Sequence, residues 1–335
     1  MFIKLLKYIL FELPNKVRVF KIKGIKSTGL NFRIDKMSTI ASKSIRIGHN
    51  VTIGKNVHIS TDELVIGNDS SIQDNTTILA KRRVDIGSNS IIQNHVEIGG
   101  LQTAHSEFKM GNHVNIFPYS FLNTTMPLIL EDYVGIGGSN YIFTHGSWQD
   151  AYEGFPYSFA PVTIKEGAWL PWRVFVMPGV TIGKEATIGS DALITKNIPD
   201  RSFAVGVPAK VVKTKEQYIK VMTPINKTEL MTEILKSFSE YLTHFKNISA
   251  KFKFEDDCPI VTLSNGMNIK YDINKQIANQ NEIILTELDS KSNISKNVID
   301  LKNKQCTWST NQINSLLIKH LSNYGIKINC PDKYA

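Results

Sequence analysis

Residues 47–59 read IGHNVTIGKNVHI, with isoleucine at every sixth position. The spacing continues to residue 194 as seven groups of three aliphatic residues, and every break in it falls between two groups. The groups are Ile47/Ile53/Ile59, Ile66/Ile72/Ile78, Ile86/Ile92/Ile98, Met110/Ile116/Leu122, Leu130/Ile136/Ile142, Ile164/Leu170/Val176 and Ile182/Ile188/Ile194. A strand has a period of about two and a helix one of about 3.6, so a period of six predicts short strands that turn at fixed places. Three such strands make one coil, and stacked coils bury the aliphatic column of a β-solenoid.

This pattern resembles the left-handed parallel β-helix of the hexapeptide-repeat acetyltransferases, nearest to those that O-acetylate sugars and polysaccharides. The resemblance is strongest in residues 161–213. The family's order and spacing are followed there by Pro161-Val162-Thr163-Ile164, Ala168-Trp169-Leu170, Met177-Pro178-Gly179-Val180-Thr181-Ile182-Gly183, Thr195-Lys196-Asn197-Ile198-Pro199 and Val205-Gly206-Val207-Pro208-Ala209-Lys210. The resemblance implies acetyl-CoA as co-substrate, a homotrimer, and no metal.

The chain has 335 residues, which is long enough for two domains. Its three cysteines, Cys258, Cys306 and Cys330, all lie in the last quarter and show no CxxC spacing. This predicts a cytoplasmic protein in a reducing compartment, with neither a disulfide framework nor a zinc site.

The net charge of +9 is concentrated at the start, where residues 1–30 hold seven Lys or Arg against Glu12 alone. No nucleic-acid-reading motif accompanies this charge, so we expect no nucleic acid partner. Residues 2–13 are apolar, interrupted by charges, and too short to span a bilayer. They predict an amphipathic helix that either touches an anionic inner membrane surface or caps the first coil. The two roles are compatible.

Three domains are expected: a basic cap at 1–30, a β-helix at 31–214 with weaker hexads at Ile34 and Ile40, and an α+β accessory domain of unknown role at 215–335. Residues 201–213 should run back along the last coil. The sequence of the accessory domain predicts these elements in order: a helix at 228–245, a hairpin at 260–273 that turns at Asn265-Gly266, strands at 282–288 and 297–301, a helix at 311–321 and a strand at 326–329.

The repeat is interrupted at 101–109 and 146–161, both at the same type of corner, and insertions in repeat proteins are placed where ligands bind. Residues 146–159 hold five aromatic side chains, Trp148, Tyr152, Phe155, Tyr157 and Phe159. Such rings stack on sugars or shield a site from water. We therefore expect Trp148, Glu153 and Tyr157 to contact a carbohydrate acceptor.

By resemblance, His145 at the mouth of this loop is the catalytic base. A sugar hydroxyl becomes a nucleophile when a base takes its proton, and imidazole suits that task near neutral pH. The alternative is an ordinary corner histidine. Asn123 resembles the family's site asparagine, or else is a hydrogen-bonded rung. Asp150 and Glu153 are candidates to orient His145, or else solvated loop charges.

The resemblance also implies positions for CoA in a groove between neighbouring solenoids. Thr195, Lys196, Lys210 and Lys213 match contacts to its nucleotide end, where cations suit phosphates. Ser190 matches a backbone contact to the pantetheine arm. Trp169 matches a recurrent tryptophan, with plain packing as the alternative. The stretch Leu170-Pro171-Trp172-Arg173 departs from the family's commoner pattern, so we expect a differently lined channel there.

The resulting hypothesis is an acetyl-CoA-dependent O-acetyltransferase acting on a sugar of a bacterial surface polysaccharide or its precursor. The alternatives are N-acetylation of an amino sugar and a non-catalytic β-helix scaffold. A zinc-dependent carbonic anhydrase of the same fold is disfavoured, because His95, His113 and His145 fall on three different sides of three coils. A serine acetyltransferase or a sugar-nucleotide pyrophosphorylase would need a large N-terminal domain that residues 1–30 do not supply.

Overall fold

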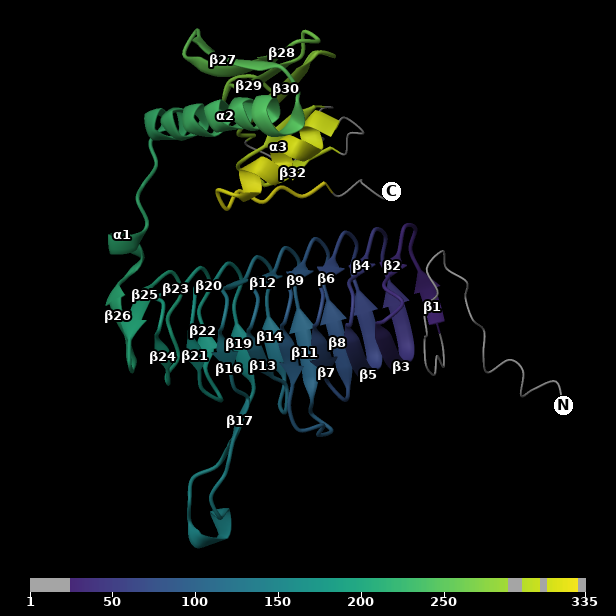
Figure 1. Ribbon diagram of the computed structural model, residues 1–335. Helices are drawn as coiled ribbons and strands as arrows, with labels where there is room; N and C mark the ends of the chain where they lie inside the picture. Colours follow the sequence, from purple (N-terminus) through teal and green to yellow (C-terminus); the bar gives the residue numbers. More distant parts are fainter. Residues whose placement is uncertain (1–24, 289–296, 308–311, 331–335) are drawn as a thin grey trace, which may run out of the picture. The chain divides into compact units, whose positions relative to one another are not determined.

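The computed structural model describes residues 25–288, 297–307 and 312–330 (Figure 1). The chain divides into two compact units, Met1–Lys220 and Val221–Ala335. The helix predicted in residues 2–13 lies outside the described residues. No helix in the described ranges has both the length and the apolar character needed to cross a membrane.

The first unit is a parallel β-solenoid of about nine turns, as the six-residue period predicts. Each coil places one short strand on each of three sides, which we name after the strands of one coil. The β12 side consists of β2 (Arg33–Ile34), β4 (Thr52–Ile53), β6 (Ser71–Ile72), β9 (Ile91–Ile92), β12 (Asn115–Ile116), β15 (Gly135–Ile136), β20 (Trp169–Leu170), β23 (Thr187–Ile188) and β25 (Phe203–Gly206).

The other two sides share one sheet, because two long strands cross from one side to the other. The β13 side contains β7 (Thr77–Leu79), β10 (Glu97–Gly99), β13 (Phe121–Asn123), β16 (Tyr141–Ile142), β21 (Phe175–Val176) and β24 (Leu193–Ile194). The β11 side contains β8 (Arg83–Ile86), β11 (Glu107–Met110), β14 (Leu128–Leu130), β19 (Val162–Ile164) and β22 (Thr181–Ile182). The strands that span both sides are β3 (Thr39–Ile47) and β5 (His58–Ile66), and β5 pairs with β7 and with β8.

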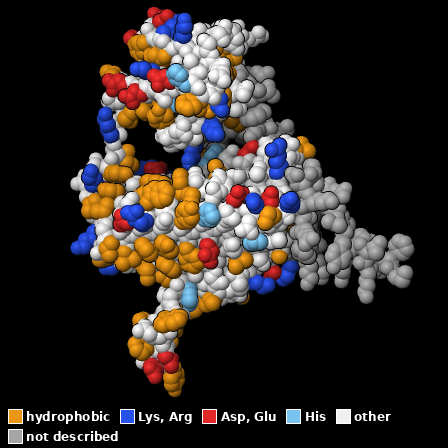
Figure 2. Space-filling view, in the orientation of Figure 1, with side chains coloured by type: hydrophobic (Ala, Val, Ile, Leu, Met, Phe, Trp, Pro, Cys, Tyr) orange, Lys and Arg blue, Asp and Glu red, His pale blue; other side chains and the backbone are white. Residues whose placement is uncertain are grey.

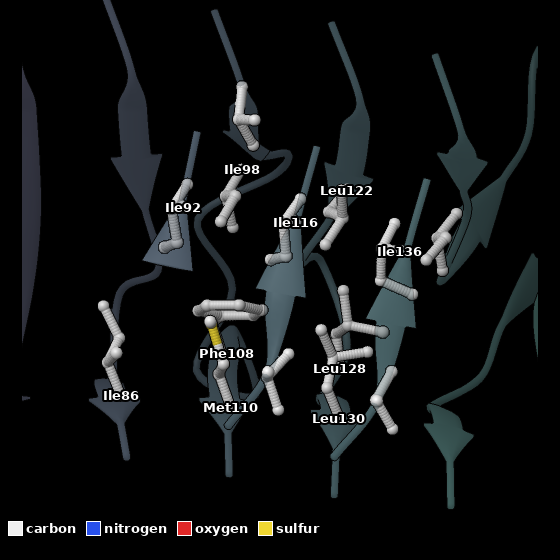
Figure 3. Close-up of a cluster of buried hydrophobic side chains, with 14 of the residues drawn as sticks. Ile86, Ile92, Ile98, Phe108, Met110, Ile116, Leu122, Leu128, Leu130 and Ile136 are labelled. Carbon is white, nitrogen blue, oxygen red and sulfur yellow. The ribbon is translucent and has the colours of Figure 1, made fainter. Parts of the chain in front are cut away.

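The aliphatic groups of the sequence pair in register from coil to coil, which confirms the predicted fold. The pairs on the β13 side include Ile98 with Leu122, Leu122 with Ile142 and Ile142 with Val176. These side chains point inward and form one continuous core (Figure 3). Phe108 is the largest of them, and it is fully buried beside Met110. Removing this apolar column from water is the main stabilising term of the fold.

The corners explain why the period is six. Between the β12 and β13 sides, Asn56 and Asn75 have a φ of 56°, and His95 and Tyr119 take φ values of 58° and 63°. One residue in this left-handed region turns the chain sharply from one side of the coil to the next, and asparagine tolerates that region better than most residues. A corner at each side keeps most strands of the solenoid two to four residues long, with β3 and β5 as exceptions that cross a corner.

The ends of the solenoid extend the prediction. Residues 201–213 run back as expected, because β25 pairs antiparallel with β26 (Ala209–Lys213). β1 (Ile25–Thr28) pairs with β3, so these residues, which the sequence assigns to the cap, form a strand of the solenoid. A short helix α1 (Lys215–Tyr218) follows β26.

The second unit is an α+β fold with its own core. Its six-stranded sheet consists of β27 (Ala250–Glu255), β28 (Cys258–Leu263), β29 (Asn268–Tyr271), β30 (Glu282–Thr286), β31 (Val298–Asp300) and β32 (Gln305–Cys306), and it packs with α2 (Pro224–Lys246) and α3 (Gln312–Ser322). The two helices and the hairpin at Asn265-Gly266 confirm the prediction. The predicted strand at 326–329 is wrong in extent, since it is reduced to a bridge between Asn329 and Gln305.

The cysteines differ from the prediction. The structure joins Cys306 of β32 to Cys330 in a disulfide, with the two Cα atoms 5.1 Å apart. The bridge between Gln305 and Asn329 brings the two cysteines together, and sequence spacing gives no sign of that long-range pairing. The expectation of no disulfide is therefore wrong for this pair. Cys258 is free, and burial raises the pKa of its thiol.

Candidate functional site

The candidate site lies on the corner where the chain passes from the β13 side to the β11 side. We name this corner the arm edge, because the insertion at 145–161 leaves from it between β16 and β19. The shorter insertion leaves the same edge two coils earlier, between β10 and β11, as expected. Residues 107–109, which the sequence assigns to that insertion, instead belong to β11 and pair with β8.

The longer insertion forms a hairpin that we call the arm. Its base is a two-stranded ladder of β17 (His145–Gly146) and β18 (Ser158–Phe159), and its tip carries the 3₁₀ helix η2 (Ala151–Glu153) (Figure 1). Trp148 and Tyr152 are each 98% exposed. The arm aromatics therefore lie outside the solenoid axis, as the absence of a period in their spacing indicates.

His145 is the first residue of the arm and is half-buried. Its Nε2 lies 3.0 Å from the Ser147 hydroxyl, and its ring packs against Phe159 with centroids 4.5 Å apart. Phe159 reaches this position because it pairs with His145 across the ladder. The imidazole is thus fixed on one face by an aromatic ring and at one nitrogen by a hydroxyl.

The group that holds His145 differs from both candidates of the sequence analysis. Asp150 accepts a hydrogen bond from the Tyr152 amide over 2.8 Å and caps η2, and Glu153 lies within η2. The structure gives the orienting contact to Ser147 instead. The sequence could have indicated Ser147 only through its place two residues after His145, since alternate residues of a strand point to the same side.

Asn123 lies in the coil before His145 and is buried. Its Oδ1 accepts from the Thr144 hydroxyl over 2.7 Å and from the Thr125 amide over 3.1 Å. The Met126 amide in turn donates to the Thr144 hydroxyl over 3.1 Å. Asn123 makes the hydrogen bonds of a rung, and its role as the site asparagine stays a prediction. Thr144, the residue before His145, links this rung to the base of the arm.

The amide nitrogen of Asn123 faces the shorter insertion. A Cβ atom on Gly100 would lie 2.7 Å from that nitrogen and 2.6 Å from the Thr125 hydroxyl, and Gly100 has a φ of +157°. Only glycine allows so close an approach. The Leu101 amide donates to the Thr125 hydroxyl over 3.0 Å, so the insertion is anchored to the coil of Asn123.

The residues expected to hold CoA lie on different parts of the solenoid in one chain. Thr195 and Lys196 follow β24 and lie on the arm edge, two coils after His145. Ser190 lies at the opposite end of β24, between β23 and β24. Lys210 and Lys213 lie on β26, where they pair with Val205 and Phe203.

The three lysines of this set, Lys196, Lys210 and Lys213, are exposed, and among the described residues they make no ion pair. Exposed ammonium groups without a carboxylate partner fit the phosphates of a nucleotide. The assignment of these residues to CoA stays a prediction, and one chain does not bring all of them together.

Trp169 and Trp172 have an evident packing role. The ring of Trp169 covers Gly135 and that of Trp172 covers Gly138, where an added Cβ would overlap the indoles. Both rings meet Phe117 edge to face, with centroid distances of 6.3 and 6.4 Å. Trp169 thus has packing contacts, and because it is still 37% exposed its contact with the co-substrate stays a prediction.

Two other histidines of the solenoid stack along its corners. His95 lies against Tyr119 and His113 against Tyr133, each with centroids 5.1 Å apart and nearly parallel planes. His95 lies between the β12 and β13 sides, His113 between the β11 and β12 sides, and His145 on the arm edge. Within the described ranges no three His, Cys, Asp or Glu side chains gather as a metal site.

Comparison with known proteins gives short local matches. No family model matches the chain. A stretch of 60 residues is 43% identical to galactoside O-acetyltransferase of Escherichia coli, which covers 18% of this chain and 29% of that protein. The first curated relatives are matched over only 27% to 30% of their own length.

Solved structures show similar solenoids. A hexapeptide-repeat acetyltransferase from Vibrio cholerae, in complex with acetyl coenzyme A, is 17% identical with a TM-score of 0.31, over 44% of this chain and 69% of that one. A UDP-N-acetylglucosamine acyltransferase from Bacteroides fragilis is 16% identical with a TM-score of 0.43, over 66% and 86%. At such scores the two likenesses carry no argument about function.

Proposed function

We propose that this protein is a hexapeptide-repeat acetyltransferase that moves an acetyl group from acetyl-CoA to a sugar hydroxyl of a surface polysaccharide or its precursor. The observation that carries the proposal is His145: an accessible imidazole, fixed by Ser147 and Phe159, at the base of an aromatic arm on one edge of a hexapeptide solenoid. The local match to galactoside O-acetyltransferase supports an oxygen acceptor.

The geometry suits direct transfer. The acceptor hydroxyl binds at His145 Nε2, either in place of the Ser147 hydroxyl or beside it. His145 then removes the proton of the acceptor hydroxyl as the acceptor oxygen attacks the thioester carbon. The C–S bond breaks, and the imidazolium returns the proton to the leaving thiolate. A positioned general base contributes about 10²–10⁴-fold to such a step. No covalent acyl-enzyme is needed.

The arm supplies the acceptor side of the proposed site. Trp148 and Tyr157 present exposed rings that can stack on a sugar, and Glu153 at the tip can accept hydrogen bonds from its hydroxyls. In this proposal the side-chain amide of Asn123 donates a hydrogen bond to the acceptor, and it lies next to Gly100 at the same edge.

The co-substrate side requires a second copy of the chain. Lys196 lies on the arm edge, whereas Ser190 and Lys210 lie toward the other end of the β13 side. A groove between two parallel solenoids brings one edge of each together, and a closed ring of three copies makes three equivalent grooves. The homotrimer is part of this proposal, and the separation of these residues on one chain is what supports it.

We place the reaction in the cytoplasm, where acetyl-CoA is available, with the basic N-terminal residues contacting the inner membrane surface. The disulfide between Cys306 and Cys330 opposes a reducing compartment. Mass mapping of the thiols in protein isolated without reductant decides between a reducing and an oxidising compartment. A disulfide between Cys306 and Cys330 in protein from the native cell would overturn the cytoplasmic placement.

The experiment on the activity is release of the CoA thiol with hydroxyl and amino sugars, followed by mass analysis of the product. His145→Ala should lower kcat about 10²–10⁴-fold while acetyl-CoA binding by calorimetry stays within twofold. Activity above a tenth of wild type would remove His145 from the mechanism. Transfer to nitrogen alone would favour N-acetylation, and no acetyl-CoA binding would favour a scaffold.

A further inference from the structure

A row of basic side chains occupies the N-terminal part of the arm edge and the adjoining β11 side. We call these residues, Lys43, Arg46, Lys81, Arg82 and Arg83, the basic strip. Lys43 and Lys81 both contact Asp62, at 2.9 and 3.3 Å. Arg46 and Arg83 both contact Glu63, at 2.9 and 3.0 Å. The carboxylates are thus shared between cations of successive coils.

Exposure shows which charge the strip presents to the solvent. The side chains of Lys43, Lys81, Arg82 and Arg46 are between 48% and 69% exposed. The carboxylates beneath them, those of Asp62, Glu63, Glu107 and Asp85, are between 15% and 35% exposed. Arg83, which is 31% exposed, lies as deep as these carboxylates. The outer layer therefore consists of the other four cations, and the carboxylates below hold them in place. Figure 2 shows Lys and Arg side chains at the lower edge of the N-terminal part of the solenoid.

The strip is aligned with the proposed site. Lys81 follows β7 at the arm edge, and His145 follows β16, which is three strands further along the same sheet. At about 4.8 Å between neighbouring strands, the two corners are on the order of 14 Å apart along the edge. Between them lie the coil of Asn123 and the shorter insertion, where Leu101 and His105 are exposed.

We propose that the basic strip binds the anionic groups of a glycan chain whose acetylated residue lies at His145. This inference deepens the proposed function and rests on it for the reaction at His145. A charged row that leads along one edge to the candidate base suits an extended polymer that carries carboxylate, sulfate or phosphate groups. Cations of this kind attract an anionic chain at long range and set its register through exposed ion pairs.

Direct binding tests the strip without any acetyl transfer. Calorimetry on the full chain would use octamers of polygalacturonate, polysialate and hyaluronan, with maltooctaose as the neutral probe. At least one anionic octamer should bind more tightly than maltooctaose at low salt and weaken as NaCl is raised, because exposed charges are screened. Equal binding of the neutral probe, or no binding of any anionic octamer, overturns the proposal.

Substitutions locate the binding. Lys43→Gln and Lys81→Gln should each weaken the anionic octamer about two- to fivefold, the range of an exposed ion pair, and Lys81→Arg should restore wild-type binding. Lys55→Gln is the matched control, because Lys55 is exposed on the edge between the β12 and β13 sides. Equal loss in Lys55→Gln would mean that net charge alone binds the octamer, and the strip would be rejected.

Two further measurements separate this proposal from its rivals. Vesicles with and without phosphatidylserine test for a membrane surface, and preferential loss of vesicle binding in Lys81→Gln would assign the strip to lipid. The acetyl-CoA dissociation constant should be unchanged in both Gln variants. If the protein shows no acetyl transfer but binds octamers through Lys43 and Lys81, the proposed function is rejected and the basic strip is kept. If the protein is active but octamer binding is unchanged in both Gln variants, the basic strip alone is rejected.

Discussion

Thr144→Val should weaken the link between the coil of Asn123 and the base of the arm. The Thr144 hydroxyl is fully buried, donates to Asn123 Oδ1 over 2.7 Å and accepts from the Met126 amide over 3.1 Å. Valine keeps the shape of threonine and removes both bonds. A buried group left without its partner costs about 1–3 kcal/mol. At about 2–4 °C per kcal/mol, the melting temperature of the solenoid should fall by about 2–12 °C.

Thr144→Val should also lower kcat, because Thr144 directly precedes His145 and its loss of hydrogen bonds can displace the imidazole. A small displacement of a catalytic group lowers kcat by up to about 10²-fold. The assay is calorimetric melting together with kcat for the best acceptor. Thr144→Ser is the matched control, since it keeps the hydroxyl and loses one methyl group, at about 0.8 kcal/mol. If Thr144→Val equals Thr144→Ser in melting and in kcat, the link described here has no role.

Three further outcomes are expected. Lys196→Ala and Lys210→Ala should raise the KM of acetyl-CoA about tenfold, as lost contacts of about 1–2 kcal/mol would, and leave the acceptor KM unchanged; if both still discriminate against dephospho-CoA as wild type does, the nucleotide lies elsewhere. Trp148→Ala should raise the acceptor KM with no change in melting temperature, because the side chain is 98% exposed; unfolding would make the arm a structural plug. Burial lowers the pKa of His320 below its ordinary 6.5, so the unfolded chain takes up the proton first. Its contribution to stability is therefore complete above pH 6.5 and lost as the pH falls below that value. The second unit should melt earlier at pH 5 than at pH 7, and less so in His320→Gln; equal pH dependence in the two proteins would exclude His320.

The repeat made the solenoid predictable almost to the residue. Ile98, Leu122 and Ile142 are each the third residue of their six-residue-spaced group, and they pair with one another on adjacent strands. Each strand of a coil pairs with strands of the coils next to it, so a local period carries the three-dimensional register. The edge of both insertions followed from the same count.

Contacts that occur once were harder to predict. The sequence offered acidic residues to orient His145, but the arm folds back on itself and gives that place to Ser147. The disulfide depends on the bridge between Gln305 and Asn329, and β27 of the second unit was missed because its outward side chains are polar or charged. No period announces such pairings, since they depend on segments that meet only after folding.

The coil spacing gives the molecule a fixed scale of length. His145 and Lys196 leave the same edge two coils apart, which at about 4.8 Å for each coil sets a separation on the order of 10 Å. Duplicating a coil between them would lengthen that interval by one step, because the strands of a coil pair only with strands of the coils next to it. On the proposed function, the distance between the reactive and the charged end of the bound co-substrate would be set in whole coils, and inserting or deleting one coil would change it by one step.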